Sequence, residues 1–307
     1  MAGNTATRTY TIYIAKLKIG DYVDYKYKNG SDTYQLSKTY SGYTSNQEIS
    51  QDKNIKWRIL NIDENNKVDL ISAEPTSQEV YFRGFLGYNN GVDLLNDICE
   101  KLYGNNTNGI EARSINLKDM ETHLTDTGFA KRNSYVFETG AVQYGNFKTF
   151  ATSLSYYPNK YANQIGSGIN TATVAKPNII NTVDPYNESK YMNKMITGYS
   201  QANTNGLTIT NTFYSIEINE ENYGEAANVL KSTNLYWIAA NAVGTTSKYI
   251  CFEIRGASKT IGGRSMYDSH NYPYSVYYRL RPIISFNNGI VIKGGNGTED
   301  IPYEIEQ

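Results

Sequence analysis

The chain has 307 residues, enough to bury one or two hydrophobic cores. Its formal net charge is -1, so it has no excess of cations to displace phosphate counterions, and we expect neither nucleic acid nor an anionic membrane as its main partner. No apolar run reaches the roughly 18 residues that a membrane span needs, and we therefore expect no membrane insertion. Only 19% of the residues are charged while 29 are tyrosine, so uncharged polar groups and aromatic rings are expected to dominate the surface.

The first residues are predicted to form a β-prone arm. Residues 9–14 alternate in a strand-like composition before any globular pattern begins, and a lone strand must pair with something. It is either an edge strand of its own domain or an arm, residues 1–17, that adds to a neighbouring subunit of a homo-oligomer. The start also lacks the basic-then-apolar pattern of a secretory leader. We expect release without that route, as for a virion component on lysis, or prior removal of a leader.

Short strands follow the arm. Residues 21–27 alternate and lead into the turn-forming pair Asn29 and Gly30. Residues 55–62 and 67–72 flank the turn-forming tract 63–66. These segments predict a small antiparallel β region.

The period then changes to that of a helix. From Gly91, leucine and isoleucine residues recur at helical spacing until Gly104. Asn116 is a plausible N-cap for a second, shorter helix with an acidic first turn. Residues 219–231 predict a third helix. Helices in an otherwise β-rich chain indicate an α+β fold with antiparallel sheets, two or three short helices and long irregular loops.

The middle of the chain shows little periodicity. Residues 125–215 are rich in Tyr, Asn, Gly and Thr, and segments such as 197–212 are typical of long loops or irregular strands. We predict one domain over residues 18–307 with an insertion around 125–215.

The sequence carries no recognised catalytic or metal-binding motif. The only histidines are His123, expected to be a surface or packing residue, and His270. No nucleophile elbow, zinc-protease, redox or phosphate-loop motif occurs, so we expect no enzyme, no cofactor and no metal site. Cys99 and Cys251 are expected to be buried free thiols, with one disulfide as the alternative.

The last quarter of the chain carries the most informative pattern. Two apolar anchors, residues 235–240 and 278–285, enclose a tract of mostly Tyr, Ser, Asn, Asp, His and Gly. Binding surfaces use this composition because Tyr supplies contact area at low rotamer cost while small polar residues adapt their hydrogen bonds. An AT-rich genome would produce the same bias without any function. The candidate ligand-binding residues of this tract are Tyr267, Asp268, His270, Asn271, Tyr272 and Tyr274.

Two tyrosines next to this tract can be assigned in two ways. Tyr277 and Tyr278 either extend the aromatic surface or belong to the core, since they adjoin the anchor. We expect one core to join the two halves of the chain. Its predicted members are Trp57, Ile59, Leu60, Trp237, Ile238, Phe252, Ile254, Leu280, Ile283 and Ile284.

The anchors also resemble a family. Residues 235–240, the Arg-Pro-Ile-Ile-Ser tract at 281–285 and the Gly-Gly-Asn-Gly-Thr tract at 294–298 resemble the "YWLAS…RPVVSL…GGDGT" pattern of bacterial and phage modules with a C-type-lectin-like fold, and more distantly the variable proteins diversified by retroelements. Residues 57–60 and 87–114 are similar to the N-terminal half of the same modules. The resemblance covers roughly residues 18–307 and implies a C-type-lectin-like fold. The calcium-binding tripeptides of true C-type lectins are missing, so we expect no calcium in binding.

This combination favours a non-enzymatic surface protein. The leading hypothesis is a phage virion protein, serving as a head fibre, decoration or receptor-binding protein. Its expected partners are other virion subunits and a host cell-surface glycan or protein. The alternatives are a bacterial cell-surface or pilus-associated adhesin, located on the bacterial cell surface, and a purely structural assembly subunit.

Overall fold

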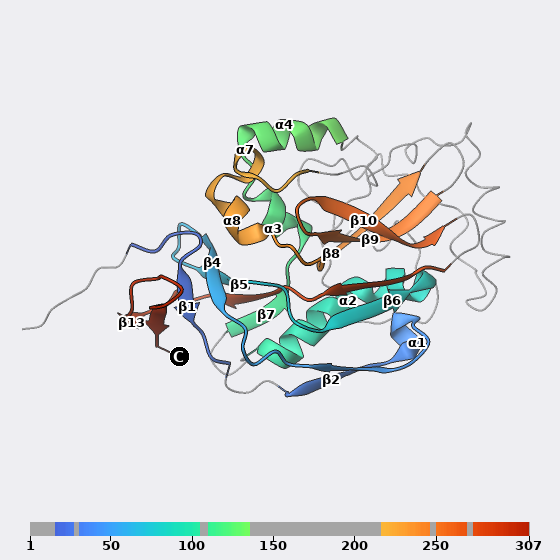
Figure 1. Cartoon of the computed structure of the whole chain (residues 1–307), viewed down its shortest axis with the longest axis horizontal. Helices are drawn as coiled ribbons and strands as arrows, with labels where there is room; N and C mark the ends of the chain where they lie inside the picture. The colour runs from blue at the N-terminus through green and yellow to red at the C-terminus, as the bar shows by residue number, and fades with distance from the viewer. Residues whose placement is uncertain are drawn as a thin grey trace, which may run out of the picture.

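A computed structural model describes residues 16–27, 31–104, 110–135, 216–245, 250–268 and 273–306. These residues form three sheets and several helices, so the predicted α+β class with mostly antiparallel sheets is confirmed (Figure 1). Residues 1–15 of the predicted arm lie outside the described residues. Leu17, the last residue of that arm, packs against the core.

Among the described residues, seven strands form the largest sheet in the order β13-β14-β1-β4-β5-β12-β7. Its fully buried strand β12 lies between β5 and β7 and pairs antiparallel with both. The pair β1–β14 is parallel. The strands of this sheet are β1 (Tyr22–Asp24), β4 (Trp57–Ile62), β5 (Val68–Ser72), β7 (Ile110–Ser114), β12 (Pro282–Phe286), β13 (Ile292–Gly294) and β14 (Tyr303–Ile305).

The second sheet carries the predicted binding tract. Its order within the described residues is β10-β9-β8-β11-β6, and the pair β8–β11 is parallel. The strands are β6 (Glu79–Arg83), β8 (Tyr236–Thr245), β9 (Ile250–Ala257), β10 (Ile261–Asp268) and β11 (Ser275–Arg279). A separate pair, β2 (Thr33–Leu36) with β3 (Gln47–Ser50), lies along the edge of the molecule (Figure 1).

Helix α2 (Gly84–Tyr103) contacts both large sheets and is buried along almost its whole length. Its buried residues include the polar side chains of Asn90, Asp93 and Asn96 as well as its apolar ones. It begins at Gly84, earlier than the predicted start at Gly91, and two of its glycines are close packing contacts. A Cβ on Gly91 would lie 2.2 Å from Cδ1 of Ile254, and one on Gly87 would lie 3.0 Å from Cβ of Phe82.

The shorter helices follow local capping signals. Asn116 accepts a hydrogen bond from the Asp119 backbone while the Asp119 carboxylate accepts one from the Asn116 backbone, so the predicted N-cap is confirmed as a capping box. The predicted helix over 219–231 is wrong as a single element, because Gly224 has φ +54° and divides it. The remaining helices are α1 (Lys38–Ser41), α3 (Leu117–Glu121), α4 (Asp126–Tyr135), α7 (Glu220–Tyr223), the 3-10 turn η5 (Gly224–Ala226) and α8 (Ala227–Leu230).

The predicted common core is confirmed for every member whose side chain is described. Trp57 is 2% exposed and Trp237 is 0% exposed, and both belong to one cluster of buried side chains. Trp237 donates its indole N–H to the Val80 carbonyl oxygen at 3.0 Å. The Phe252 side chain lies outside the described part of the chain. Cys99 is a buried free thiol, as predicted, and Cys251 lies in strand β9.

One further prediction needs correction. The strand expected over 21–27 is shorter, because only Tyr22–Asp24 pair with β4 and β14. The segment 125–215 begins with the ordered helix α4, whose Phe129 N–H donates to the Thr125 carbonyl oxygen at 2.8 Å. Residues 136–215 of the predicted insertion lie outside the described residues.

Candidate functional site

The predicted binding tract leaves the second sheet at the end of β10 and returns at the start of β11. Tyr267 and Asp268 are the last two residues of β10, where they pair with Phe252 and Cys251 of β9. Tyr274 directly precedes β11. His270, Asn271 and Tyr272 lie outside the described residues, so the structure describes the two ends of this loop.

Hydrogen bonds hold the returning end of the loop in place. The Tyr274 backbone N–H donates to the Met266 carbonyl oxygen at 3.0 Å, which ties it to β10. The Tyr274 carbonyl oxygen accepts from the Gly84 N–H at 3.4 Å, at the start of α2. The Tyr274 side chain is nevertheless 40% exposed. A fixed backbone therefore presents this ring to solvent.

Three tyrosines form a row beside the loop, which we call the tyrosine row (Tyr43, Tyr81 and Tyr277). The rings of Tyr43 and Tyr81 are 4.9 Å apart and those of Tyr81 and Tyr277 are 5.0 Å apart, with tilts of 31° and 35°. Tyr81 and Tyr277 are cross-strand neighbours on β6 and β11. Tyr277 is 50% exposed, whereas Tyr278 is 5% exposed and belongs to the core. Of the two predicted alternatives, Tyr277 therefore extends the aromatic surface and Tyr278 belongs to the core.

Side-chain amides close the open edge of β6 next to this row. The Gln47 amide donates to the Tyr81 carbonyl oxygen at 2.8 Å and accepts from the Tyr81 N–H at 2.9 Å. Gln78 makes the reciprocal pair of bonds to the backbone of Glu48 and Ser50 in β3. Because these backbone groups are occupied, this part of β6 is not free to pair with another strand. Tyr43 and Tyr81 are distant from the tract in sequence, and no sequence pattern pointed to them.

A polar groove lies at the other end of the hairpin β9–β10, which we call the hairpin groove. It has a volume of about 280 Å³. Its walls combine one exposed cation, several hydroxyls, an exposed leucine and three glycines. The lining residues are Leu235, Gly256, Ser258, Thr260, Ile261, Gly262, Gly263, Arg264 and Tyr278.

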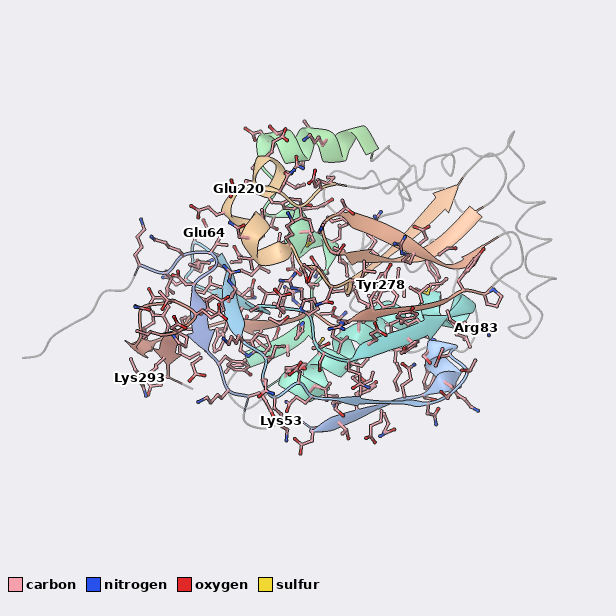
Figure 2. All side chains as sticks on the ribbon, in the orientation of Figure 1. Lys53, Glu64, Arg83, Glu220, Tyr278 and Lys293 are labelled. Carbon is pink, nitrogen blue, oxygen red and sulfur yellow. The ribbon has the colours of Figure 1, made fainter. Side chains whose placement is uncertain are left out.

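Tyr278 links this groove to the core. Figure 2 labels it between the hairpin β9–β10 and helix α2. Its ring packs over Gly256, where a Cβ would lie 2.4 Å from Cε2 of Tyr278. Its hydroxyl oxygen accepts a hydrogen bond from Nε of Arg264. Burial raises the pKa of Tyr278, so the phenol keeps its proton at neutral pH.

A buried carboxylate lies close to the groove. Glu253 is 3% exposed, and its Oε2 occupies the space where a Cβ of Gly263 would be, at 1.9 Å. Within the described residues, neither this oxygen nor Oγ of the cross-strand neighbour Ser265 has a hydrogen-bond partner. Burial raises the pKa of Glu253 to about 7, although Arg255 and Arg264 act to lower it. The sequence did not indicate this residue, because the alternation of residues along its strand is typical of any strand.

Other kinds of site have less support in the described part of the chain. No three His, Cys, Asp or Glu side chains gather there as a metal site, and no helix there is long and apolar enough to cross a bilayer. Burial lowers the pKa of His123, which is half-buried near Asp119. A scan against protein-family models, a search of curated proteins and a search of solved structures each found no match to this chain.

Proposed function

We propose that this protein is a non-enzymatic recognition protein of a virion surface, built on a C-type-lectin-like frame. The loop between β10 and β11 contacts a host cell-surface glycan or protein. The observation that carries this proposal is the pair of exposed rings where the loop returns, Tyr274 at 40% and Tyr277 at 50% exposure, on a strand whose backbone is held.

Rigid aromatic side chains are effective contact residues. A tyrosine orders only two side-chain torsions on binding and offers both an apolar ring and a hydroxyl. The backbone of Tyr274 is bonded to β10 and to the start of α2, so little backbone order remains to be gained on binding. These features support recognition, because a ligand meets a surface that is already formed.

The location and partners belong to the same proposal. As a head fibre, decoration or receptor-binding protein, the chain would assemble as a homo-oligomer with other virion subunits, and the arm at 1–17 would contact a neighbour. A cell-surface adhesin and a structural subunit are the competing functions. Neither is favoured by a separate feature of the described residues.

The test removes the rings of the loop. Replacing Tyr267, Tyr272 and Tyr274 together with Ala should leave the thermal unfolding midpoint within a few degrees, because exposed residues contribute about 0.5 kcal/mol or less each. Attachment to the target cell, or to its purified wall polysaccharide, should fall steeply, since aromatic anchors dominate such interfaces.

A matched control uses exposed apolar residues distant from the loop. Val291 and Ile301 are 61% and 55% exposed near β13 and β14, and their double replacement with Ala should leave attachment unchanged. Unchanged attachment by a stable triple variant would exclude this loop as the recognition site. The structural-subunit function would then be favoured.

A further inference from the structure

The hairpin groove is separate from the recognition loop. The loop begins after Asp268, at the far end of β10, whereas the groove is formed around residues 258–264 at the near end. Its volume of about 280 Å³ is slightly below the roughly 300–1,000 Å³ of pockets for drug-sized ligands. The groove therefore suits one small ring or a single unit of a longer chain.

The groove presents a guanidinium in a fixed orientation. Arg264 is exposed, and its Nε donates to the hydroxyl oxygen of the buried Tyr278. This bond orients the plane of the guanidinium. The two terminal nitrogens of Arg264 make no hydrogen bond within the described residues. Two parallel N–H donors are the arrangement that binds a carboxylate in bidentate fashion.

The remaining walls suit a sugar ring. Ser258 and Thr260 provide hydroxyls that can donate to or accept from the hydroxyls of a sugar. Leu235 is 43% exposed and offers an apolar wall for the C–H face of the ring. At Gly262 a Cβ would meet nothing within 4 Å, so this backbone is open to close approach by a ligand.

We propose that the hairpin groove binds one carboxylated sugar unit, a uronic acid, of a surface glycan. Arg264 binds the carboxylate, Ser258 and Thr260 bind ring hydroxyls, and Leu235 packs against the apolar face. This inference rests on the proposed recognition function and gives it a second, acidic-glycan subsite. The ligand class follows from the combination of one forked cation with hydroxyls and a single apolar wall.

The test measures binding of a galacturonic acid trisaccharide to the full chain by titration calorimetry. Arg264→Gln should weaken binding about tenfold or more, because it removes the hydrogen bonds to a charged group. Arg264→Lys keeps the charge but loses the two parallel N–H donors, so its affinity should lie between that of the unchanged chain and that of Arg264→Gln. Thr260→Val, which removes one hydroxyl with little change of shape, should weaken binding by a smaller factor.

Lys259 supplies the matched control. It is exposed in the same turn but does not line the groove, so Lys259→Gln removes an equal charge and should change the affinity less than twofold. Thermal unfolding of each variant shows whether it is folded. The inference is overturned if the trisaccharide does not bind the unchanged chain, if a neutral galactose trisaccharide or inorganic phosphate binds equally well, or if Arg264→Gln has no effect in a folded chain. The loop variant's attachment to cells decides the proposed function independently of these results.

Discussion

Arg281 and Glu253 are both buried charged side chains, but their surroundings differ. The Arg281 guanidinium donates to the carbonyl oxygens of Ser72, Ala73, Val229 and Leu230 and lies 4.7 Å from the ring centroid of Tyr236. Oε2 of Glu253 has no hydrogen-bond partner within the described residues. Buried polar groups normally have hydrogen-bond partners. Arg281 follows this rule and links the segments that carry its four carbonyl partners, whereas the unpaired oxygen of Glu253 departs from it. Glu253 lies next to the hairpin groove.

The largest expected effect on stability comes from removing the Arg281 guanidinium and its hydrogen bonds. Arg281→Ala removes this donor from four carbonyl groups, of which the Leu230 carbonyl keeps the Tyr236 hydroxyl as a donor and the Ala73 carbonyl is only partly buried. Each buried group left without a partner costs about 1–3 kcal/mol. The free energy of unfolding should therefore fall by about 3 kcal/mol or more, measured by urea denaturation. Arg279→Ala, at a partly exposed position two residues away, should cost far less. Equal losses in the two variants would show that the bonds of Arg281 contribute little.

Glu253 should make stability depend on pH. Burial raises the pKa of the folded carboxyl to about 7 from an ordinary value of 4.5. Between these values the folded state holds a proton that the unfolded state has released, so the contribution of this group to stability is greatest below pH 4.5 and falls as the pH rises to about 7. The loss amounts to about 3 kcal/mol, at 1.36 kcal/mol for each pKa unit.

The Glu253→Gln variant isolates this contribution. Its free energy of unfolding should lose that part of the pH dependence, so that the variant gains stability relative to the unchanged chain as the pH rises from 4.5 to about 7. Denaturation curves at several pH values measure it. A constant difference across this range would mean that Glu253 is ionised in the folded protein throughout.

The smallest effects concern the glycines of the hairpin. A methyl group on Gly263 would meet the Glu253 carboxylate, so Gly263→Ala should cost about 1–3 kcal/mol as an overpacked site. Gly262→Ala meets nothing within 4 Å and should be neutral or slightly stabilising. Adding Glu253→Ala should remove most of the cost at Gly263, which a double-mutant cycle measures. Additive costs would place the carboxylate elsewhere.

Elements with a local cause could be predicted from the sequence. The capping box at Asn116 and Asp119 is formed by residues three apart. The turn at 63–66 is held by Asp63, whose carboxylate accepts from the backbone of Asn65 and Lys67. The apolar anchors likewise indicated a core around Trp237, because long apolar runs have to be buried. Such signals depend on neighbours along the chain and survive without knowledge of the fold.

The start of α2 and the two candidate surfaces could not be predicted in this way. The apolar spacing predicted a helix only from Gly91, whereas α2 begins at Gly84, and its Gly87 and Gly91 pack closely against Phe82 and Ile254. The tyrosine row joins Tyr43 and Tyr81 to Tyr277 only because β6 pairs with β11. The loop residues were predicted from their composition, and among them the structure describes the surroundings of Tyr274. The composition around Arg264 and Glu253 is not unusual, so the sequence did not indicate these two residues.

The sequence by itself determined the α+β class, the core of the two anchors and the local caps and turns, because periodicity and capping act over a few residues. The tertiary structure decided which charges are buried and which rings are exposed. Arg281 and Arg264 are both arginines near apolar strands, yet one is enclosed by carbonyl groups and the other lines a groove. That difference depends on strand pairing between residues far apart in the chain, and the energetic cost of burying a charge depends on those distant partners.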